Sequence, residues 1–366
     1  MRFPEFCGEW KKCTINDLAT VVGGGTPDTT VKSYWGGDIQ WFTPSEIGKN
    51  KYVDFSLRTI TRDGLDNSSA KLLPLHTILL SSRATVGECS IASNECTTNQ
   101  GFQSLIAKQC NIDFLYYLIQ TKKKDLIRNA CGSTFLEISA NEIRKIKVAV
   151  PVQNEQEQIA KLLSLVDERI ATQNKIIEKL ESLINGIYSV VFQSRSCKEC
   201  FHLGEISNLY QPSTISSADL NYEGKYLVYG ANGVIGRYDK YNHEQPQITI
   251  TCRGNTCGTV NYTSSFCWIT GNSMVINIEK YTTIVNQRYL FHYLKSINFS
   301  SIISGSGQPQ IVRTPLEKLR IYLPTLAEQQ KISANIDIII TKLTLEQSML
   351  GYFQQQKQYL LRQMFI

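Results

Sequence analysis

Apolar residues recur at intervals of three and four positions through two long stretches of the chain, residues 152–196 and 325–366. This spacing places the apolar side chains on one face, so it predicts a long amphipathic helix in each stretch. At 1.5 Å per residue, about forty residues would extend roughly 60 Å, which is longer than a small domain is wide. A helix of that length needs an apolar partner, and we expect the two helices to pack on each other. The apolar positions are Ile159, Leu162, Leu163, Val166, Ile170, Ile177, Leu180, Ile184 and Ile187 in the first stretch, and Ile332, Ile336, Ile339, Leu343, Leu350, Phe353, Leu360 and Met364 in the second.

The two helical stretches belong to an internal repeat. Residues 145–151, with the sequence KIKVAVP, correspond to residues 318–324, with the sequence KLRIYLP, at an offset of 173 positions. Each proline opens the same pattern, Pro-x-x-x-Glu-Gln-x-x-Ile. The chain is therefore predicted to hold two copies of one unit, each a globular lobe followed by a long helix.

The lobes show the short, punctuated pattern of mixed α/β structure. Apolar runs bounded by Gly, Asn and Ser predict strands, and longer amphipathic stretches predict helices. Residues 145–150 and 318–323 alternate and end in proline, which is typical of an edge strand or an extended lead-in. The predicted strands include residues 76–81, 247–251 and 274–278, and the predicted helices are residues 113–128 and 285–297.

The predicted fold class is therefore mixed α/β, with two globular lobes separated by two long antiparallel helices. With the two copies related by a pseudo-two-fold axis, the helices are expected to form an antiparallel coiled coil. The predicted domains are lobe one (1–151), the central helix (152–196), lobe two (197–324) and the C-terminal helix (325–366).

The positive charge lies in the lobes. The chain has a net charge of +6, and each lobe carries a surplus of three while the helices are near neutral. Such a surplus permits phosphate binding without requiring it. Two similar basic lobes at a fixed separation suit a ligand with two similar sites, and duplex DNA is the obvious candidate.

The composition excludes some classes and leaves one metal alternative open. No run of about eighteen apolar residues is present, and residues 1–10 lack the apolar stretch of a secretory signal, so a cytoplasmic protein without a membrane span is expected. Eleven scattered cysteines are then expected to be reduced thiols. Cys197 and Cys200 have C-x-x-C spacing, and a zinc site would need two more ligands such as Cys252 and Cys257. No metal site is predicted, with that set as the alternative.

Short motifs in both lobes resemble the specificity subunits of type I restriction–modification systems. Lobe one carries GGTP at residues 24–27 and YWGGDIQW at residues 34–41, which resemble the opening of many target recognition domains in this family. Lobe two carries YGANG at residues 229–233, RG at residues 253–254 and TGN at residues 270–272, which resemble a second common type. The two Pro-x-x-x-Glu-Gln-x-x-Ile segments resemble the family's helix starts, so the resemblance covers essentially the whole chain.

The resemblance implies a DNA-binding subunit that is not an enzyme by itself. The lobes would be two target recognition domains that read an asymmetric, two-part duplex sequence, with the helices as spacers that dock two modification subunits. Those methyltransferase subunits would bind S-adenosylmethionine and methylate a flipped adenine in each half-site, and restriction subunits would use ATP and Mg²⁺. The chain itself is expected to hold no cofactor, since it lacks an Asn-Pro-Pro-aromatic motif and a Gly-x-x-x-x-Gly-Lys-Ser/Thr loop.

Alternative functions stay open at this point. The chain could be the specificity subunit of a related bipartite methylation system, or a coiled-coil scaffold that binds protein. A self-sufficient nuclease or transferase is a third class, which turnover of DNA by the purified chain would reveal.

The candidate DNA-contacting residues are polar and basic side chains on the predicted loops, because such groups reach base edges and phosphates. A solvated or turn-forming role is the alternative for each one. Arg83 and Arg253 carry extra weight because they occupy matching positions in the two copies. The run at residues 122–124, three lysines, is interpreted as a solvated helix face, with phosphate contact as the alternative. The candidates are Lys49, Lys51, Arg62, Ser82, Arg83, Thr98, Asn99 and Gln100 in lobe one, and Asn232, Arg237, Tyr238, Lys240, Arg253, Asn255 and Asn272 in lobe two.

The first turn of each long helix holds a second set of candidates. Glu155 with Gln156, and Glu328 with Gln329, are predicted to contact the modification subunits. The alternative is capping chemistry, because acidic residues favour helix N-termini. Both roles can hold together.

Overall fold

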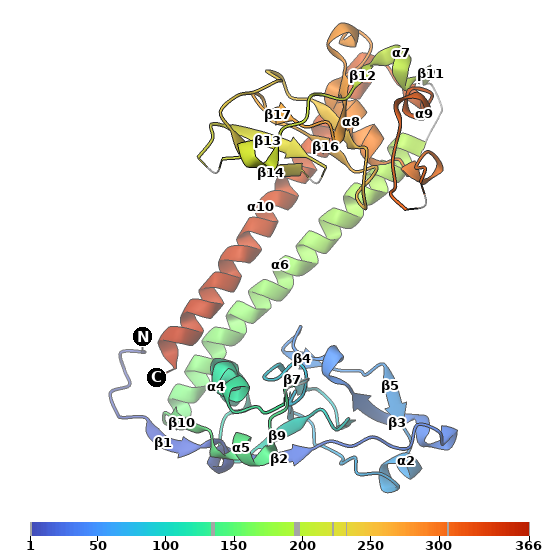
Figure 1. Ribbon diagram of the computed structural model, residues 1–366. Helices are drawn as coiled ribbons and strands as arrows, with labels where there is room; N and C mark the ends of the chain where they lie inside the picture. The colour runs from blue at the N-terminus through green and yellow to red at the C-terminus, as the bar shows by residue number, and fades with distance from the viewer. Residues whose placement is uncertain are drawn as a thin grey trace. The chain divides into compact units, whose positions relative to one another are not determined.

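The computed structural model of the protein describes residues 2–132, 136–193, 198–221, 223–231, 233–305 and 307–365. The chain divides into two compact units (Figure 1): unit 1 holds residues 1–175 and 348–366, and unit 2 holds residues 176–347. The two predicted long helices are present as α6 (Gln153–Gln193) and α10 (Leu326–Met364), and each unit contains a part of both. No described helix has an apolar stretch long enough to cross a bilayer.

Lobe one, in unit 1, is built on small sheets. A five-stranded sheet has the order β2-β9-β6-β7-β4, a three-stranded sheet has the order β5-β3-β8, and β1 pairs antiparallel with β10 as a separate ribbon. The ribbon confirms the predicted strand before the proline. The strands are β1 (Lys11–Thr14), β2 (Ala19–Gly23), β3 (Trp35–Phe42), β4 (Tyr52–Val53), β5 (Arg58–Ile60), β6 (Ile78–Leu80), β7 (Cys89–Ala92), β8 (Cys96–Thr98), β9 (Gln103–Ala107) and β10 (Lys147–Val150).

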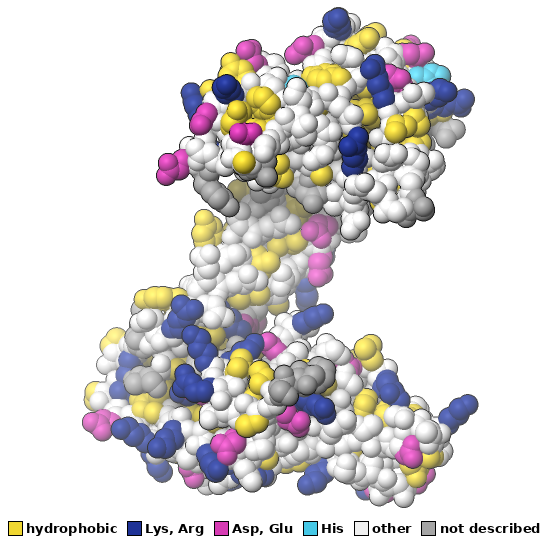
Figure 2. All heavy atoms as spheres, in the orientation of Figure 1, with side chains coloured by type: hydrophobic (Ala, Val, Ile, Leu, Met, Phe, Trp, Pro, Cys, Tyr) yellow, Lys and Arg dark blue, Asp and Glu magenta, His cyan; other side chains and the backbone are white. Residues whose placement is uncertain are grey.

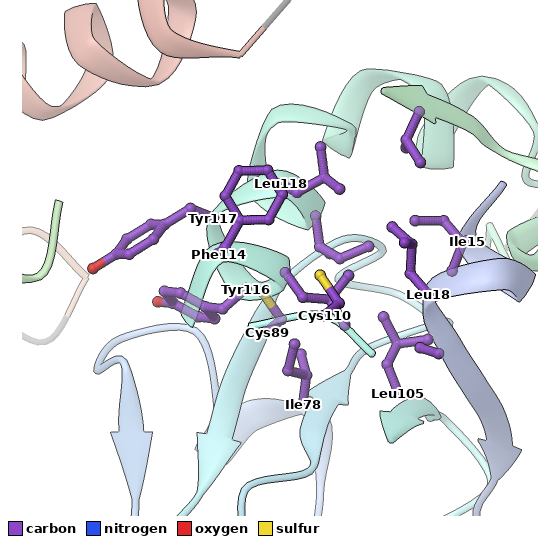
Figure 3. Close-up of a cluster of buried hydrophobic side chains, with 14 of the residues drawn as sticks. Ile15, Leu18, Ile78, Cys89, Leu105, Cys110, Phe114, Tyr116, Tyr117 and Leu118 are labelled. Carbon is purple, nitrogen blue, oxygen red and sulfur yellow. The ribbon is translucent and has the colours of Figure 1, made fainter. Parts of the chain in front are cut away.

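Helices cover one face of the larger sheet of lobe one, whereas α2 (Arg62–Asp66) packs on the three-stranded sheet. Figure 3 shows Ile78, Cys89 and Leu105 projecting from the larger sheet toward the helix that carries Phe114 and Tyr117, in a fully buried core. The helices are α1 (Ile15–Leu18), α2 (Arg62–Asp66), α3 (Ile112–Thr121), α4 (Lys123–Arg128) and α5 (Ala140–Lys145), with 3-10 turns at Lys32–Tyr34 and Pro44–Glu46.

The prediction of one helix over residues 113–128 is wrong in one respect, because the structure has two helices joined at Lys122. The hydroxyl of Thr121 donates to the carbonyl of Leu118 at 2.7 Å, a local bond that competes with the helical ladder. The break turns three consecutive lysines into a corner between α3 and α4.

Within unit 1, α6 and α10 run antiparallel. Lys357 of α10 forms an ion pair with Asp167 of α6 at 2.7 Å, and Arg169 lies 5.7 Å from the ring of Phe353. Between these two contacts the residue number rises along α6 and falls along α10, so the predicted antiparallel pairing is confirmed within unit 1. The apolar end of α10 joins the core of lobe one, where Leu360, Leu361 and Met364 are buried.

Lobe two, in unit 2, repeats this plan. A four-stranded sheet has the order β12-β18-β15-β16, a three-stranded sheet has the order β14-β13-β17, and β11 pairs antiparallel with β19. The strands are β11 (Glu199–His202), β12 (Asn208–Tyr210), β13 (Tyr226–Gly230), β14 (Gly233–Tyr238), β15 (Ile248–Thr251), β16 (Val260–Tyr262), β17 (Trp268–Ile269), β18 (Ser273–Asn277) and β19 (Arg320–Leu323). The helices are α7 (Leu203–Ile206), α8 (Gln287–Lys295) and α9 (Arg313–Glu317), with 3-10 turns at Ser217–Asp219, Glu279–Tyr281 and Phe299–Ser301.

A polar junction joins α8 to both long helices inside unit 2. The buried imidazole of His292 shares a hydrogen bond with Asp337 of α10 through Nε2 at 2.8 Å and one with the hydroxyl of Tyr188 of α6 through Nδ1 at 2.9 Å. Arg288 completes the junction with a bidentate ion pair to Asp337. Burial lowers the pKa of His292 below its usual value, although the Asp337 carboxylate opposes this shift.

Candidate nucleic-acid interface

In lobe one, the chain turns back on itself after β6 and presents Arg83 at the turn. The backbone N–H of Gly87 donates to the carbonyl of Ser81 at 3.0 Å, and the N–H of Ser81 donates to the carbonyl of Glu88 at 2.8 Å. Ala84 (φ 63°) and Gly87 (φ 88°) lie in the left-handed region. A left-handed alanine costs roughly 1–2 kcal/mol, so its surroundings must hold this turn in place.

Two further segments of lobe one flank the Arg83 turn. The N–H of Ser82 donates to the carbonyl of Gly101 at 2.8 Å, and the N–H of Ile138 donates to the carbonyl of Ser82 at 2.9 Å. These bonds place three loops side by side at one end of the sheet. We call residues 81–88, 98–102 and 136–138 the Arg83 edge.

Lobe two builds the same turn after β15 and presents Arg253. The N–H of Gly258 donates to the carbonyl of Thr251 at 2.9 Å, and the N–H of Thr251 donates to the carbonyl of Thr259 at 2.9 Å. Gly254 (φ 87°) takes the left-handed place that Ala84 takes in lobe one. The same frame therefore carries an arginine in both lobes.

The flanking segments are also repeated. The N–H of Cys252 donates to the carbonyl of Asn272 at 3.0 Å, and the N–H of Ile311 donates to the carbonyl of Cys252 at 2.9 Å. The frame is made by main-chain hydrogen bonds in both copies, so its side chains are free to differ. We call residues 251–259, 270–273 and 309–311 the Arg253 edge.

The two edges differ in charge beside the arginine. Arg83 forms an isolated β-bridge with Glu137, and its Nε lies 3.8 Å from a carboxylate oxygen of that residue. Arg253 forms the corresponding bridge with Gln310. No described carboxylate forms an ion pair with Arg253, whereas Arg83 is partly neutralised.

Several predicted DNA contacts are exposed side chains. Lys49, Lys240, Asn255 and Asn272 are all exposed, and Asn272 belongs to the Arg253 edge. Gln100 is exposed on the Arg83 edge, where its amide oxygen accepts a hydrogen bond from Thr26. The predicted contact Asn232 lies outside the described residues.

Two predicted basic contacts are held by residues of their own units. The Lys51 ammonium donates to the hydroxyl of Ser164 at 2.6 Å and forms an ion pair with Asp113 at 2.7 Å, and its side chain is 10% exposed. The guanidinium of Arg237 donates to the carbonyl of Gly224 at 3.2 Å, although Arg237 itself is exposed. Both cations are engaged in contacts that fix local structure.

Two predicted hydroxyl contacts are buried within the Arg83 edge. Ser82 and Thr98 are at most 1% exposed, and their hydroxyls find no hydrogen-bond partner among the described residues. Asn99 accepts a hydrogen bond from the N–H of Gly101 at 2.9 Å, which is the turn-forming role named as its alternative. Ser82 and Thr98 lie behind the arginine turn and do not reach the surface.

The remaining predicted contacts lie on exposed or half-buried parts of the lobes. Arg62 forms an exposed ion pair with Asp66 at 3.3 Å on α2. The ring of Tyr238 packs edge-on against Trp268, with the centroids 5.3 Å apart. The structure does not bring either residue to an arginine edge through a described contact.

The first turn of α6 is fastened to lobe one. The Gln156 amide oxygen accepts from the N–H of Asn111 at 3.0 Å, and its amide nitrogen donates to the carbonyl of Pro151 at 2.9 Å. Glu155 is fully buried and binds the Arg2 guanidinium through two hydrogen bonds of 2.7 Å. Sequence reasoning missed this internal role, although the repeated glutamine was its signal.

The first turn of α10 is fastened to lobe two in the same way. The Gln329 amide oxygen accepts from the N–H of Asn286 at 2.8 Å, and its amide nitrogen donates to the carbonyl of Pro324 at 2.9 Å. Glu328 is exposed and caps the helix by accepting from the N–H and hydroxyl of Thr325. The predicted contact with modification subunits stays a prediction, and among these four residues only Glu328 offers an exposed carboxylate.

The described residues contain no cluster of His, Cys, Asp and Glu suited to a metal ion. The described cysteines are free thiols, and burial raises the pKa of Cys89, Cys96 and Cys110 to about 12 each. These thiols are therefore protonated at neutral pH. Cys197, part of the alternative zinc set, lies outside the described residues.

Two α/β lobes with matched arginine edges, each followed by a long helix, define a protein built from two copies of one unit. The family model for the type I restriction modification DNA specificity domain matches residues 8–182 and 197–350. The chain belongs to this family, as the sequence motifs predicted.

Known relatives carry the same description. The chain is 39% identical over 183 residues to the type I restriction enzyme MjaIX specificity subunit of Methanocaldococcus jannaschii, a match that covers 47% of this chain and 42% of that protein. It is 24% identical over 361 residues to the EcoprrI specificity subunit of Escherichia coli, covering 90% and 86% of the two chains. A crystal structure of the type I restriction–modification S subunit from M. genitalium shares the fold, with a TM-score of 0.69, 18% identity and coverage of 100% and 99%.

Proposed function

We propose that this chain reads a two-part, asymmetric duplex DNA sequence, with one half-site at each arginine edge. The proposal rests on the repetition of one backbone frame that presents an exposed arginine in both lobes. The frames are alike and their side chains differ, so the two lobes suit two different half-sites. Identical lobes would suit a palindrome.

The chemistry of the edges fits base readout. An arginine donates two parallel hydrogen bonds to O6 and N7 of guanine in the major groove, and Asn or Gln does the same for adenine. The Arg83 edge offers Gln100 and the Arg253 edge offers Asn272 as the amide. Each edge thus combines a guanidinium with an amide.

A stripe along α10 supports docking of modification subunits. In unit 1, Tyr352 and Tyr359 are 69% and 53% exposed; in unit 2, Ile338 and Leu345 are 67% and 61% exposed; each pair is spaced by seven residues. Residues at heptad spacing lie along one face of a helix, so an exposed apolar series of this kind suits the face of a partner helix. S-adenosylmethionine would bind in those modification subunits, and ATP with Mg²⁺ in restriction subunits, so this chain contributes recognition and no catalysis.

The decisive experiment is a methylome. The chain would be expressed with its neighbouring modification gene in a methylation-free host, and modified adenines would be read by single-molecule sequencing. We expect one split motif with two different halves. A palindromic or continuous motif would contradict the proposal, as would the absence of methylation when both proteins are soluble and associated.

Two substitutions assign the halves to the lobes. Arg83→Ala should relax or abolish one half of the motif, and Arg253→Ala the other, because each good bidentate contact contributes about 1–3 kcal/mol of discrimination. Arg128→Ala, an exposed arginine of lobe one outside both edges and outside the predicted contacts, is the matched control and should leave the motif unchanged. If one arginine affected both halves equally, the assignment of one half-site to each edge would be wrong.

A further inference from the structure

Unit 1 contains a large cavity between lobe one and the long helices. Its volume is about 1540 Å³. Its walls are residues 48–52, the end of the Arg83 edge, the corner between α3 and α4, and faces of α6 and α10. Pockets for small molecules are usually about 300–1,000 Å³ and mainly apolar, whereas this cavity is larger and has charged walls. It therefore suits a segment of a polymer.

The lining of the cavity is strongly basic. Eight Lys and Arg residues and four Asp and Glu residues line it, a surplus of four positive charges in a chain whose net charge is +6. Figure 2 shows Lys and Arg side chains gathered over α4 and the neighbouring ends of the long helices. Most of the surplus charge of the chain therefore surrounds one cavity.

The floor of the cavity is neutralised and fixed. Lys51 pairs with Asp113, and Lys357 pairs with Asp167, both at 2.7 Å, and both lysine side chains are at most 17% exposed. The two ammonium groups lie 4.9 and 5.7 Å from the ring centroid of Tyr117. One pair lies within lobe one and the other joins α6 to α10, and both leave little charge for a ligand.

The rim carries the uncompensated charge. No ion pair within the described ranges neutralises its five cations, which come from four different segments. Cations held around one opening repel one another, so an anionic occupant would stabilise the arrangement. The rim cations are Lys49, Lys122, Lys124, Lys175 and Arg362.

The cavity is not part of the repeated frame. When the helix cap Asn111 is aligned with its counterpart Asn286, residues 122–124 correspond to residues 297–299. That segment reads Ile-Asn-Phe and carries no charge. The cationic rim at this corner therefore belongs to lobe one alone.

We propose that this cavity binds the phosphodiester backbone of duplex DNA beside the half-site read by lobe one. Gly87 and Glu88 belong to the Arg83 edge and also line the cavity, so a strand that leaves the edge would enter it directly. This continuity favours DNA over an acidic protein as the occupant. The inference rests on the proposed function and adds a contact that gives affinity without reading sequence.

The salt dependence of DNA binding by the full chain tests the proposal. Each lost phosphate contact lowers the slope of log K against log salt by about 0.9, so three lost contacts lower it by about 2.7. The affinity ratio of wild type to variant should then shrink by about 40-fold between about 50 and 200 mM salt. Fluorescence anisotropy of a labelled duplex measures both quantities. The test variant replaces three rim cations, Lys122→Gln, Lys124→Gln and Lys175→Gln.

Two matched variants control for folding and net charge. The three corresponding Lys→Arg changes keep the charge and should keep the wild-type slope. A variant with the same charge loss on exposed lysines of unit 2, Lys280→Gln, Lys331→Gln and Lys342→Gln, should change the slope by less than one contact.

The outcomes separate this inference from the proposed function. A lowered slope with an unchanged methylated motif supports the cavity as a backbone site. An unchanged slope in a folded variant overturns it and leaves sequence recognition intact. Loss of modification-subunit binding without a change in slope overturns it in favour of an acidic protein occupant, and failure of the wild-type chain to bind any duplex overturns both proposals.

Discussion

The glutamine in the first turn of α6 is the sharpest test of how the lobes hold their helices. Gln156 is 5% exposed, and it bridges the N–H of Asn111 and the carbonyl of Pro151. Replacing Gln156 with alanine removes both contacts at once. The two backbone groups lie at the start of α3 and just before α6, so they lose their partners where water has poor access.

The expected loss of stability follows from these two groups. A buried polar group left without a partner costs about 1–3 kcal/mol, so the loss of both partners in Gln156→Ala should lower the free energy of unfolding of unit 1 by about 2–6 kcal/mol. At about 2–4 °C per kcal/mol for a unit of this size, the melting temperature should fall by roughly 4–24 °C. Gln156→Glu should also destabilise, because a carboxylate can accept from Asn111 but cannot donate to Pro151.

Thermal and urea unfolding of the full chain, followed by circular dichroism, measure the effect. Gln329→Ala is the matched variant in the other copy and should destabilise unit 2 by a similar amount, because Gln329 bridges Asn286 and Pro324. Glu328→Ala removes only an exposed capping contact and should cost about 0.5–2 kcal/mol. If Gln156→Ala shifted the melting temperature no more than Glu328→Ala, the internal role of the glutamine would be refuted.

Three further outcomes are expected. Glu137→Gln should strengthen duplex binding, because it removes a carboxylate beside Arg83. Gln310→Glu should weaken duplex binding, because it adds a carboxylate beside Arg253. Effects of equal size and the same sign in anisotropy measurements would contradict the charge argument. Burial lowers the pKa of His292, so below about pH 6.5 the unfolded chain binds a proton that the folded chain does not, and the free energy of unfolding should fall as pH falls. His292→Gln should flatten this pH dependence of the melting temperature. An unchanged pH dependence in that variant would exclude the imidazole as its cause. Tyr352→Glu places a charge among the exposed apolar residues of α10. It should weaken co-purification of the modification subunit at least tenfold with little effect on the melting temperature. Unimpaired co-purification would exclude this face of α10 as the docking surface.

The helices and the repeat could be predicted because their signals are local. The three- and four-residue spacing of apolar positions specifies α6 and α10 within a few residues, and the shared proline and Glu-Gln pattern marks both helix starts. The corner at Lys122 was missed because apolar spacing reports which residues are helical and not where the backbone ends one helix and begins the next. Periodicity continues through such a corner without a visible change.

The site was only partly predictable because side-chain direction depends on tertiary structure. Arg83 and Arg253 could be singled out as candidates because the repeat places them at matching positions, and the structure gives both the same backbone frame. Ser82 directly precedes Arg83 in the chain and points inward, since neighbouring side chains of extended backbone face opposite sides. The cavity of unit 1 could not be predicted, because its cations come from segments far apart in the sequence.

The two copies also complete each other, which bears on how specificity can change. Phe365, at the end of α10, packs against Phe114 of lobe one, with ring centroids 5.2 Å apart. Phe192, at the end of α6, packs against Tyr289 of lobe two at 5.4 Å. Each lobe is therefore closed by the helix that follows the other lobe.

This arrangement distinguishes the contacts that stabilise the fold from the exposed side chains that can vary. The ends of both helices and the glutamine bridges fix each lobe to the long helices, and the main-chain hydrogen bonds fix each arginine edge. Substitutions at exposed edge positions such as Gln100 or Asn272 break none of these contacts and should cost little stability. We therefore expect that exposed edge residues of one lobe can change while the fold of the other lobe and its helix remains unchanged.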